Sequence, residues 1–556
     1  MSTIFGVDLG TTYTKCARVR PLDGEVEIYA VDHAPGRPDD HLHTLRSAVS
    51  LTLDRRGDRI AHVGRGAMAA SEAWSDGAPP MRYVEESKLW IGEGLADHDP
   101  DAPPWIFDGH GWEYSAEDIG ALVLKKMRKV VEARGTVMGE VVITHPQAFN
   151  DPRRKATAQA AQLAELVVVD TLTEPNAAAL AFLGADPAPG KYMVFDLGGG
   201  TLDVTVAEIA ADRFTVLGNA GTKRGGRDFD RAIFAWLVDR YREAWPNFED
   251  RFLDDRNTRR WYQIAEDAKV ELNDPAVPDK RIQVVCKSRK YDGMKSTHFL
   301  TRAEFLDRTQ ELVDDCLRCA DEALRWSGVT WEGLTSIVCV GGSSRLVHVR
   351  EALAARSGRP LRTDLDPDVA VVQGAALHAH RLATRRASVS LVSSAGIPVP
   401  IEVPTESSAG RVGRAVIGNA LPNGLGIKAW SASRREWVVA NLLAKGTPLP
   451  CRVSVADKFV TNQDDVETLD VELWEGERPE LKRCNRVGTA TLRGIPAGKA
   501  GPVVVTVEAD VNLERRLIVE AFGKRTEAII EYDPLMVMSE DELTRRREFL
   551  RLVEVV

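Results

Sequence analysis

Two stretches of the chain follow the same plan, and this repeat limits the possible fold more than any other feature. IFGVDLGTTYTKCARV (4–19) and YMVFDLGGGTLDVTVAEI (192–209) each combine an apolar strand, Asp-Leu-Gly, a small-residue turn with Thr, and a second apolar strand. A unit that recurs about 190 residues later indicates two lobes of common design. The sequence therefore predicts an α/β fold in which each lobe offers one such turn.

Each turn has the composition of a phosphate-binding hairpin. Glycine lets backbone N–H groups approach phosphate oxygens closely, and threonine hydroxyls add donors. Asp8 and Asp196 end the preceding strands, where two carboxylates suit a hydrated Mg²⁺. A pair of ordinary hairpins with Asp at the turn is the alternative, but the repetition favours phosphate. The candidate hairpin residues are Gly10, Thr11, Thr12 and Tyr13 in the first lobe and Gly198, Gly199, Gly200 and Thr201 in the second.

A third glycine turn follows a later apolar strand, in IVCVGGSSRLVHVREAL (337–353). Gly341, Gly342 and Ser343 lie between this strand and a helix, and the planar guanidinium of Arg345 suits stacking on a nucleoside base. A generic strand-to-helix turn explains the same residues equally well. The glycine spacing is neither that of a dinucleotide site nor that of a Walker loop, so those two types of nucleotide site are disfavoured.

The character of the chain changes near residue 384. Residues 1–384 alternate between strand-like and helix-like stretches and form the predicted two-lobed domain. Short β-rich runs separated by turn residues over 423–535 predict a β-sandwich. The intervening 385–422, rich in Ser, Gly, Pro and Val, is interpreted as a linker and entry segment. Within the last segment, 536–556, a capping box from Ser539 to Glu542 opens a short helix.

Composition argues against several classes of function. The formal net charge is −10 and no block of Lys/Arg stands out, so nucleic acid is not an expected partner. No apolar run reaches the roughly 20 residues that span a bilayer, and the N-terminus has no basic region typical of a signal peptide. Seven scattered cysteines favour a reducing cytoplasm. Cys316 and Cys319 form a CxxC, which is interpreted as two positions on a helix face rather than a redox or metal site.

A series of strings, in order along the chain, gives a resemblance to a known family. They are VDLGTTYT, SKLWIG, VVITHPQAFNDPRRKAT, TEPNAAALAF, FDLGGGTLDVTV, GGRDFDRAI, AEDAKVEL, VGGSSRL and DPDVAVVQGAA. The chain resembles the seventy-kilodalton heat-shock chaperones of the DnaK type, within the actin and sugar-kinase superfamily, over roughly 3–384 and, less closely, 424–533. The resemblance implies a two-lobed actin-like ATPase domain, a β-sandwich domain and a short C-terminal helix, with ATP/ADP and Mg²⁺ as cofactors.

The resemblance also implies roles for individual residues. Lys88, in SKLWIG, would reach the γ-phosphate, and Glu174, in TEPNAAA, would orient the attacking water. Taken alone, Lys88 also fits a solvated surface lysine, and Glu174 a helix N-terminal charge. The matches for Mg²⁺ (partly through water), the attacking water and the γ-phosphate are Asp8, Asp196, Thr201 and Asp203; those for the adenosine are Glu266, Lys269, Gly341, Gly342, Ser343, Arg345 and Asp368; and Pro146 and Arg154 match a pair that relays nucleotide state to the surface.

Several positions depart from the family pattern. Val270 and Asn273 stand where an arginine and a serine contact adenosine, and Arg227 replaces a glutamate, so nucleotide affinity is expected to differ. Gln162 stands at the position of an arginine used for J-domain partners, and the linker stretch ASVSLVSSAG has no acidic residue, which argues against J-domain coupling. Ala148 replaces an aromatic residue. The helical lid is missing after the β-domain, so faster release of a bound peptide is expected.

These features predict an ATP-hydrolysing molecular chaperone with slow, Mg²⁺-dependent turnover. Its nucleotide state would control how the β-domain grips polypeptide clients, and a nucleotide exchange factor is a further expected type of partner. An ATP-switched adaptor that docks one specific partner protein is the alternative, favoured by the altered linker and the missing lid. A filament-forming or sugar-phosphorylating relative would share the fold, but the chaperone-type strings and the appended β-domain argue against it.

Overall fold

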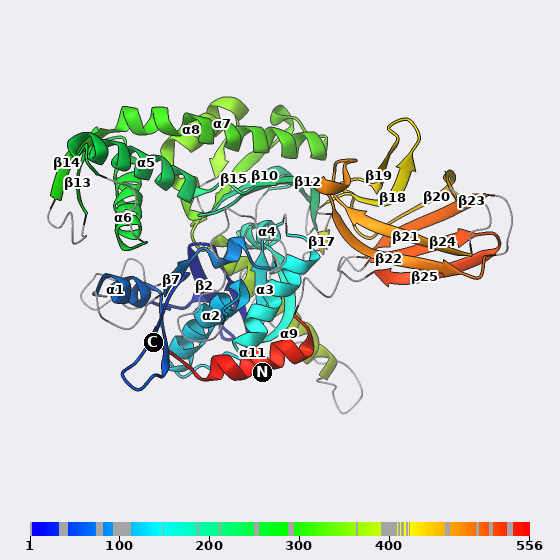
Figure 1. Cartoon of the computed structure of the whole chain (residues 1–556), viewed down its shortest axis with the longest axis horizontal. Coiled ribbons are helices and arrows are strands. Elements are labelled where there is room, and N and C mark those ends of the chain that lie inside the picture. The colour runs from blue at the N-terminus through cyan, green and yellow to red at the C-terminus, as the bar shows by residue number, and fades with distance from the viewer. Residues whose placement is uncertain are drawn as a thin grey trace.

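The computed structural model places a two-lobed α/β part beside a β-sandwich (Figure 1). It describes residues 3–32, 43–73, 82–92, 113–147, 149–185, 188–210, 213–248, 255–286, 294–362, 365–390, 409, 412, 416–418, 421, 423–461, 467–495, 500–510, 515–530 and 538–556. Within these ranges, no helix is long and apolar enough to cross a membrane. The fold class predicted from the sequence is confirmed.

The first lobe is built on a mixed sheet whose central strand, β1, is buried along its whole length. Strand β1 pairs antiparallel with β2 and parallel with β8, so the apolar run before Asp8 lies inside the lobe. The sheet has the order β3-β2-β1-β8-β9, with β4 paired to β2: β1 (Ile4–Asp8), β2 (Tyr13–Val19), β3 (Val26–Ile28), β4 (Leu45–Arg46), β8 (Glu140–His145) and β9 (Val167–Thr173). Helices α2 (Ala116–Glu132) and α3 (Asp151–Leu163) share one hydrophobic core with it.

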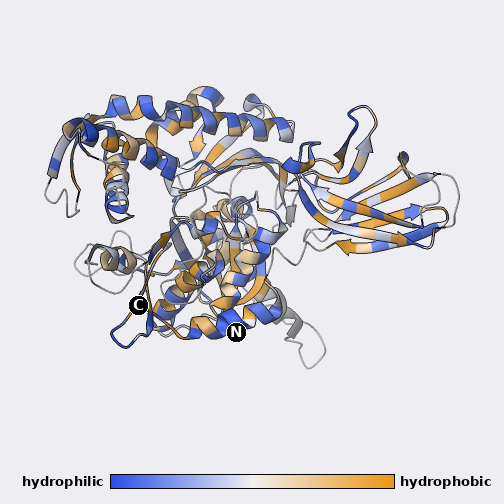
Figure 2. Ribbon diagram, viewed as in Figure 1, coloured by the Kyte–Doolittle hydropathy of each residue, from blue (hydrophilic) through white to orange (hydrophobic). Residues whose placement is uncertain are grey.

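The second lobe repeats this plan. Strand β10 pairs antiparallel with β11 and parallel with β15, as β1 does with β2 and β8. The order β12-β11-β10-β15-β16 therefore matches β3-β2-β1-β8-β9, and the internal repeat is confirmed as a repeat of topology. The strands are β10 (Gly190–Leu197), β11 (Leu202–Ala210), β12 (Arg213–Thr222), β15 (Ser336–Val340), β16 (Leu361–Arg362) and β17 (Val416–Gly418), which pairs with β12. The hydropathy colouring shows apolar residues gathered in these central strands (Figure 2).

Each lobe carries an extension beside its main sheet. The first-lobe extension is the sheet β26-β6-β5-β7 with one helix: β5 (Ala48–Leu53), β6 (Arg59–Val63), β7 (Arg82–Glu85), β26 (Val553–Val555) and α1 (Arg65–Ala73). A 3₁₀ turn, Ser87–Leu89, follows β7. The second lobe has the hairpin β13 (Asp279–Cys286) and β14 (Met294–Thr301) with helices α5 (Gly226–Ala244), α6 (Asp255–Leu272), α7 (Arg302–Ser327) and α8 (Val347–Ser357).

Two further helices pack at the centre of the α/β part. Helix α4 (Glu174–Gly184) lies against α9 (Ala370–Ser390), which also packs on β1 and β2. A Cβ at Gly374 would overlap the backbone carbonyl of Ala177, so the close approach of the two helices depends on this glycine. The strands β1 and β10 are thereby held with their carboxyl ends toward the same space.

The β-sandwich joins two antiparallel four-stranded sheets around a single core. One sheet has the order β19-β18-β21-β22 and the other β20-β23-β24-β25. The strands are β18 (Leu425–Ser431), β19 (Glu436–Leu443), β20 (Cys451–Val460), β21 (Thr468–Glu475), β22 (Asn485–Arg493), β23 (Pro502–Ala509), β24 (Arg515–Ala521) and β25 (Lys524–Ile530). The loop after β19 reaches the second lobe, where Gly446 lies beside Gly218.

Most of the predicted linker, and Ala148, lie outside the described residues. Its described parts contact both lobes. Helix α9 continues to Ser390, and Ala409 and Val412 are buried in a core that both lobes share. The Ala409 amide donates to the Gly24 carbonyl oxygen of the first lobe (3.4 Å), whereas β17 pairs with β12 of the second. The linker boundaries stay a prediction.

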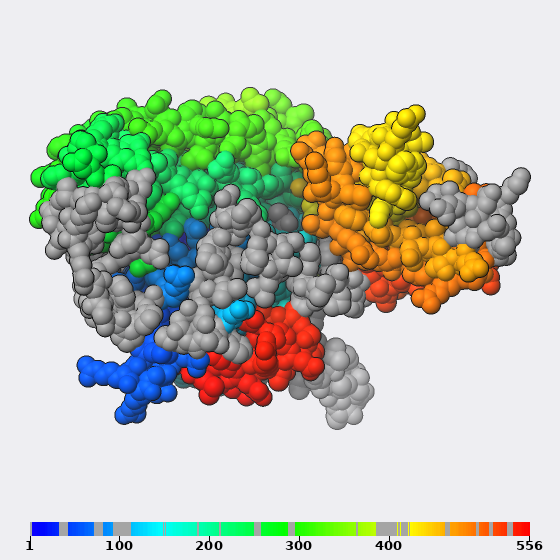
Figure 3. Space-filling view, viewed as in Figure 1, coloured from blue at the N-terminus to red at the C-terminus, as the bar shows by residue number. Residues whose placement is uncertain are grey.

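The last segment, residues 538–556, returns to the first lobe (Figure 3). Helix α11 (Glu540–Arg551) packs on α2 and α3, and β26 then pairs parallel with β6. Ser539 accepts a hydrogen bond from Glu542 N (3.2 Å) and so caps the helix as predicted, but the Glu542 side chain contacts Arg546 (2.6 Å).

Candidate functional site

A cavity of about 470 Å³ lies between the two lobes, a volume typical of small-molecule sites. Nearly all the predicted catalytic and nucleotide-binding residues line it. They are Asp8, Gly10, Thr11, Thr12, Tyr13, Lys88, Glu174, Asp196, Gly198, Gly199, Thr201, Glu266, Lys269, Gly341, Gly342, Ser343, Arg345 and Asp368. Gly200 and Asp203 stand behind this wall: both are buried, and Asp203 pairs with Asp196 across the β10–β11 ladder.

The two glycine hairpins face one another directly. A Cβ at Gly199 would overlap the Thr12 side chain, and a Cβ at Gly200 would come within 2.7 Å of the Thr11 methyl carbon. The two turns therefore close on each other only because the second lacks side chains here. Backbone N–H groups of both turns can then approach one ligand from opposite sides, which is the geometry that a polyphosphate requires.

Lys88 and Glu174 come from different elements and form a buried ion pair at the floor of the cavity. Lys88 lies in the 3₁₀ turn after β7, and Glu174 is the first residue of α4, whose N-cap is Thr173. Burial raises the pKa of Glu174, although the Lys88 ammonium opposes the shift. A phosphate oxygen at this floor would lie beside both the Lys88 ammonium and the Glu174 carboxylate.

Asp8 ends β1, Asp196 lies near the end of β10, and Asp203 lies near the start of β11 opposite Asp196; carboxylates in these places suit a hydrated divalent cation. Burial raises the pKa of Asp196 well above its usual value, and the charges of Glu174, Asp203 and Asp8 add to the shift. A cation among them would relieve that repulsion, and carboxylate oxygens are the ligands that Mg²⁺ accepts. No group of three or more His, Cys, Asp or Glu side chains in the described ranges could hold a metal by itself. Such an ion would therefore depend on ligand oxygens and water.

A lysine that the sequence analysis did not single out also lies here. Lys15 Nζ is 3.1 Å from Asp8 Oδ2, and its side chain lines the cavity. Thr144 Oγ1 donates to the other oxygen of Asp8 (3.3 Å). A charged residue shortly after the glycine turn, in TYTKCARV, was the available signal.

The third glycine turn forms the opposite end of the cavity. Gly341 has φ 76°, and a Cβ there would come within 2.5 Å of an Asp196 carboxylate oxygen, so the turn joins the phosphate end to this end. Arg345 pairs through one guanidinium nitrogen with Asp366 (2.6 Å) and Asp368 (2.8 Å), which holds the side chain at this end of the cavity. The planar Arg345 guanidinium and the close-packed glycine turn together suit a nucleoside.

Helix α6 supplies the other wall at this end. Lys269 pairs with Asp230 (2.8 Å) and donates to the carbonyl oxygen of Gly226 (3.3 Å). Asn273 donates to the Arg345 carbonyl oxygen (3.1 Å) and accepts from Val347 N (2.7 Å), so it ties α6 to the start of α8. The Asn273 amide therefore stabilises this wall of the cavity, at the position where the family has a serine.

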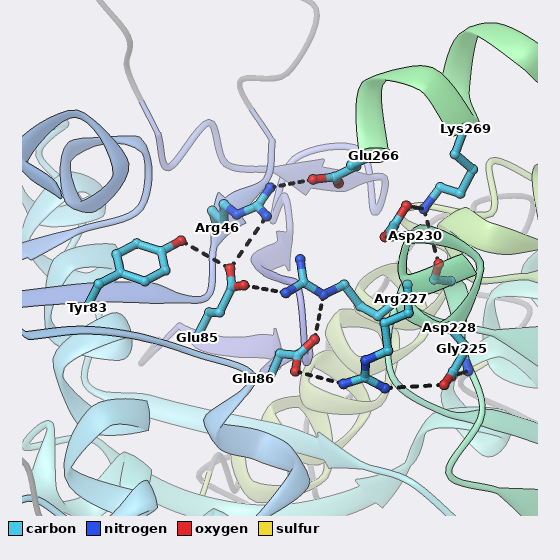
Figure 4. A network of polar contacts seen from close by, with 12 residues as sticks. Arg46, Tyr83, Glu85, Glu86, Gly225, Arg227, Asp228, Asp230, Glu266 and Lys269 are labelled. Carbon is cyan, nitrogen blue, oxygen red and sulfur yellow. Dashed lines mark hydrogen bonds and ion pairs between the residues drawn. The ribbon is translucent and has the colours of Figure 1, made fainter. Parts of the chain in front are cut away.

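A network of ion pairs joins the lobes beside the cavity (Figure 4). Arg227, on α5 of the second lobe, pairs with Glu85 and Glu86 at the end of β7 in the first. Arg46 pairs in the other direction, with Glu266 on α6 (3.0 Å) and more distantly with Glu85 (3.6 Å). The arginine that departs from the family pattern thus spans the two lobes.

The predicted relay residues lie outside the cavity. The Pro146 carbonyl oxygen is 2.9 Å from His145 Nδ1, and Arg154 is on α3, on the side of the β-sandwich. Burial lowers the pKa of Arg154 to about 10, with Arg515 of the sandwich adding to the shift and Glu475 opposing it. Arg515 and Glu475 form a buried ion pair (3.2 Å), so Arg154 meets the sandwich at that pair.

The CxxC cysteines are both buried on the inner side of α7. Burial raises the pKa of Cys316 to about 12 and that of Cys319 still further. Thiols held in this way are poor nucleophiles and poor metal ligands, and all seven cysteines are free.

Comparison with known proteins connects this geometry to one family. The family model described as "Hsp70 protein" matches residues 98–545. The chain is 30% identical to a "Chaperone protein HscA homolog" of Azoarcus sp. in an alignment 553 residues long that covers 97% of this chain and 79% of that protein. It is also 30% identical to an HscA homolog of Laribacter hongkongensis (97% of this chain, 80% of that protein). A "Heat shock cognate 70 kDa protein 3" of Dictyostelium discoideum is 29% identical (95% of this chain, 79% of that protein).

Proposed function

Because the chain belongs to the Hsp70 family of chaperones, we propose that it hydrolyses ATP and that its nucleotide state controls polypeptide binding by the β-sandwich. The observation that carries the proposal is the pair of glycine hairpins facing each other across one cavity whose floor holds the Lys88–Glu174 pair. Hsp70 proteins are ATPases, and the cavity supplies a separate place for phosphates and for a nucleoside.

Different residues of this chain would serve different roles in phosphoryl transfer. Lys88 would neutralise charge on the γ-phosphate, and Glu174 would accept a hydrogen bond from the attacking water and hold it in line. Thr201 would position the same water from the second lobe. Mg²⁺ bound with the nucleotide would supply further positive charge, and Asp8, Asp196 and Asp203 would hold it, partly through water. Positioning and charge neutralisation account for most of the rate in such reactions.

Control of the sandwich would run through α3. Arg154 lies on this helix and approaches the buried Arg515–Glu475 pair, which is fully desolvated. A small movement of α3 relative to that pair changes the environment of three charges at once, and unpaired charges in such a place are costly. Nucleotide-dependent movement of the first lobe would thereby reach the sandwich.

Exposed aromatic residues on the sandwich support a polypeptide as the ligand. Trp430 and Trp437 are 51% and 44% exposed and pack edge-on, with ring centroids 5.6 Å apart. Large aromatic surfaces left open to solvent are typical of protein-binding sites. A nucleotide exchange factor is proposed as a further partner.

Turnover and peptide release, measured together, test the proposal. Thr201→Ala and Lys88→Ala should each lower ATP turnover by about 10²–10³-fold, and peptide off-rates should stop responding to ATP. Lys280→Ala, which removes a lysine paired with Glu271 outside the cavity, should leave both unchanged. Turnover that survives both cavity substitutions would contradict the assignment.

An ATP-switched adaptor remains the second candidate. The observation that favours it is the docking of α11 and β26 on the first lobe, which holds the chain after the sandwich in one place. An adaptor should capture one partner in stoichiometric amount and should not prevent aggregation of a denatured client. A mixed set of clients, together with suppression of aggregation, would exclude it.

A further inference from the structure

A second, smaller cavity of about 30 Å³ lies between the lobes, among the residues of the ion-pair network, and is called the arginine cavity below. Its first-lobe wall includes Arg46 on β4 and Tyr83 and Glu85 on β7, and its second-lobe wall includes Arg227 on α5 and Arg260 on α6. Figure 4 shows the first four of these side chains pointing toward one another. The volume exceeds what a single water needs and suits one compact ion.

The wall of the arginine cavity carries more positive than negative charge. Four guanidinium groups and one carboxylate line it: Arg46, Arg227, Arg259, Arg260 and Glu85. Although burial opposes the shift, the charges of Arg227 and Arg46 hold the pKa of Glu85 below its usual range, so this carboxylate is already matched. Glu86 and Glu266 also pair with these two arginines, but neither lines the cavity. The wall therefore favours an anion.

Three polar atoms of this wall are buried with no hydrogen-bond partner among the described residues: Arg46 Nε, Arg260 Nη1 and Gln263 Oε1. The Arg46 residue is only 7% exposed, and buried polar groups normally have a partner. Within the described part of the chain Arg260 forms no ion pair, so it does not belong to the network that joins the lobes. Two donors and one acceptor around one small space call for a ligand with accepting oxygens and a donating O–H.

We propose that the arginine cavity binds inorganic phosphate, at a site distinct from the nucleotide cavity, and that phosphate bound there holds the lobes together. This inference goes beyond the proposed function. Guanidinium groups suit oxyanions, and two of them lie over aromatic rings: Arg227 is 5.3 Å from the centre of the Tyr262 ring, and Arg259 is 4.9 Å from that of Tyr83. At neutral pH phosphate keeps an O–H that can donate to Gln263, whereas sulfate has none. Because both lobes supply the wall, bound phosphate should also slow their opening and the release of nucleotide.

A latch made only of ion pairs is the competing explanation. It accounts for Arg46 and Arg227, which pair with acids of the opposite lobe, but not for the unpartnered atoms of Arg260 and Gln263. The two explanations differ in their response to salts. Any salt weakens an exposed latch by screening, whereas a phosphate site responds to phosphate and not to chloride at the same ionic strength.

Full-length protein saturated with Mg²⁺ and a non-hydrolysable ATP analogue provides the test, because the analogue fills the phosphate positions of the nucleotide cavity. Calorimetry should show phosphate binding with a Kd of about 1 mM or tighter, and sulfate binding about fivefold or more weaker. Stopped-flow release of an analogue labelled on the adenine should slow by about fivefold or more in saturating phosphate, and not in chloride at equal ionic strength.

Two variants and a control locate the site. Arg260→Met should weaken phosphate by about tenfold or more, the worth of a charge-assisted hydrogen bond, and should remove the effect of phosphate on release. Gln263→Leu should bind phosphate and sulfate equally. The control Arg242→Met removes an exposed arginine of α5 that pairs with Asp239, and it should behave as the wild type.

Absence of phosphate binding by the wild type, or wild-type affinity in Arg260→Met, would overturn the inference. Sulfate as effective as phosphate would do the same, because it would indicate an unselective anion site. If Arg260→Met does not fold, Gln263→Leu decides, and an unchanged preference for phosphate refutes the assignment. A protein that does not bind the analogue would contradict the proposed function alone; phosphate titrations of nucleotide-free wild type and Arg260→Met then still test this site, since Arg260 does not line the nucleotide cavity.

Discussion

Replacing Arg546 with methionine should release the last segment of the chain from the first lobe. Arg546 lies on α11, is 7% exposed, and forms an ion pair with Asp118 of α2, whose side chain is completely buried. It also contacts Glu542 (2.6 Å) and donates to the Glu113 carbonyl oxygen (3.2 Å). Methionine keeps much of the side-chain volume but removes the charge and every donor.

The expected loss of docking free energy follows from the buried Asp118 carboxylate, which loses its partner. Removing one partner of a buried ion pair leaves an uncompensated charge and costs about 3–5 kcal/mol. Release of the segment avoids that cost, so docking of residues 538–556 should weaken by up to this amount. Leu543, Phe549, Leu550, Val553 and Val555 would then leave the first-lobe core.

The effect should depend on pH, with a definite sign. Burial raises the pKa of Asp118 to about 6, although Arg546 opposes the shift. A carboxyl whose pKa is higher in the docked state than in the released state, about 3.9, stabilises docking when protonated, and this contribution is lost as the pH rises through 6. Without Arg546 the pKa of Asp118 rises further, so the loss of docking should be larger at pH 8 than at pH 5.

Hydrogen exchange of the Val556 amide, directly after β26, measures this release. The Val556 amide donates to the Ala61 carbonyl oxygen (2.9 Å) and should exchange about 100-fold or more faster in Arg546→Met at pH 8, after correction for intrinsic rates. Arg545→Met is the matched control, because Arg545 pairs with the same Glu542 at the surface and should cost less than about 1 kcal/mol. Equal protection in the two variants at pH 8, or a larger loss at pH 5, would refute the reasoning.

Three further perturbations test other parts of the molecule. Gly199→Val places a side chain where it overlaps the threonine of the facing hairpin, and calorimetry should show ADP affinity reduced by about tenfold or more; wild-type affinity would contradict the hairpin contact. Arg227→Glu sets a carboxylate against Glu85 and Glu86, and stopped-flow release of a fluorescent ADP should become faster, whereas an unchanged rate would mean that the network does not hold the lobes together. Burial, with smaller effects of neighbouring cations, lowers the pKa of His145 to about 3, so its contribution to stability is present above pH 6.5 and is lost as the pH falls toward 3; His145→Gln should reduce the acid slope of the unfolding free energy, and an identical slope would count against this.

The parts of the site that the sequence predicted are those encoded locally. Each hairpin is a continuous string in which strand, glycine turn and carboxylate follow one another, so the string alone specifies the element. Asp8 and Asp196 could be placed at strand ends for the same reason, and the repeat indicated that they face one space. The assigned roles of Lys88, Glu174 and Thr201 remain predictions, because proximity to a cavity does not establish a catalytic step.

What the sequence could not supply is which side chains meet, whether within one hairpin or between distant segments. Lys15 looked like one polar residue in a strand, and only its register opposite Asp8 makes it part of the site. Arg227 could be seen as a departure from the family, but its partners are about 140 residues earlier in the chain. Strand β26 has three residues and pairs with a strand almost five hundred residues away, and no local pattern specifies such a partner.

The first-lobe extension connects these distant contacts to one another. Its sheet has the order β26-β6-β5-β7, so the last segment of the chain occupies one edge and β7 the other. Strand β7 ends at Glu85, and Glu86 and Lys88 follow within three residues, so the residues that meet Arg227 and Glu174 are carried by the far edge of the same sheet. Helix α11 fixes the near edge to α2 and α3. Because β26 and β7 belong to one hydrogen-bonded sheet, we expect docking of the last segment to influence the position of Lys88 relative to the cavity floor.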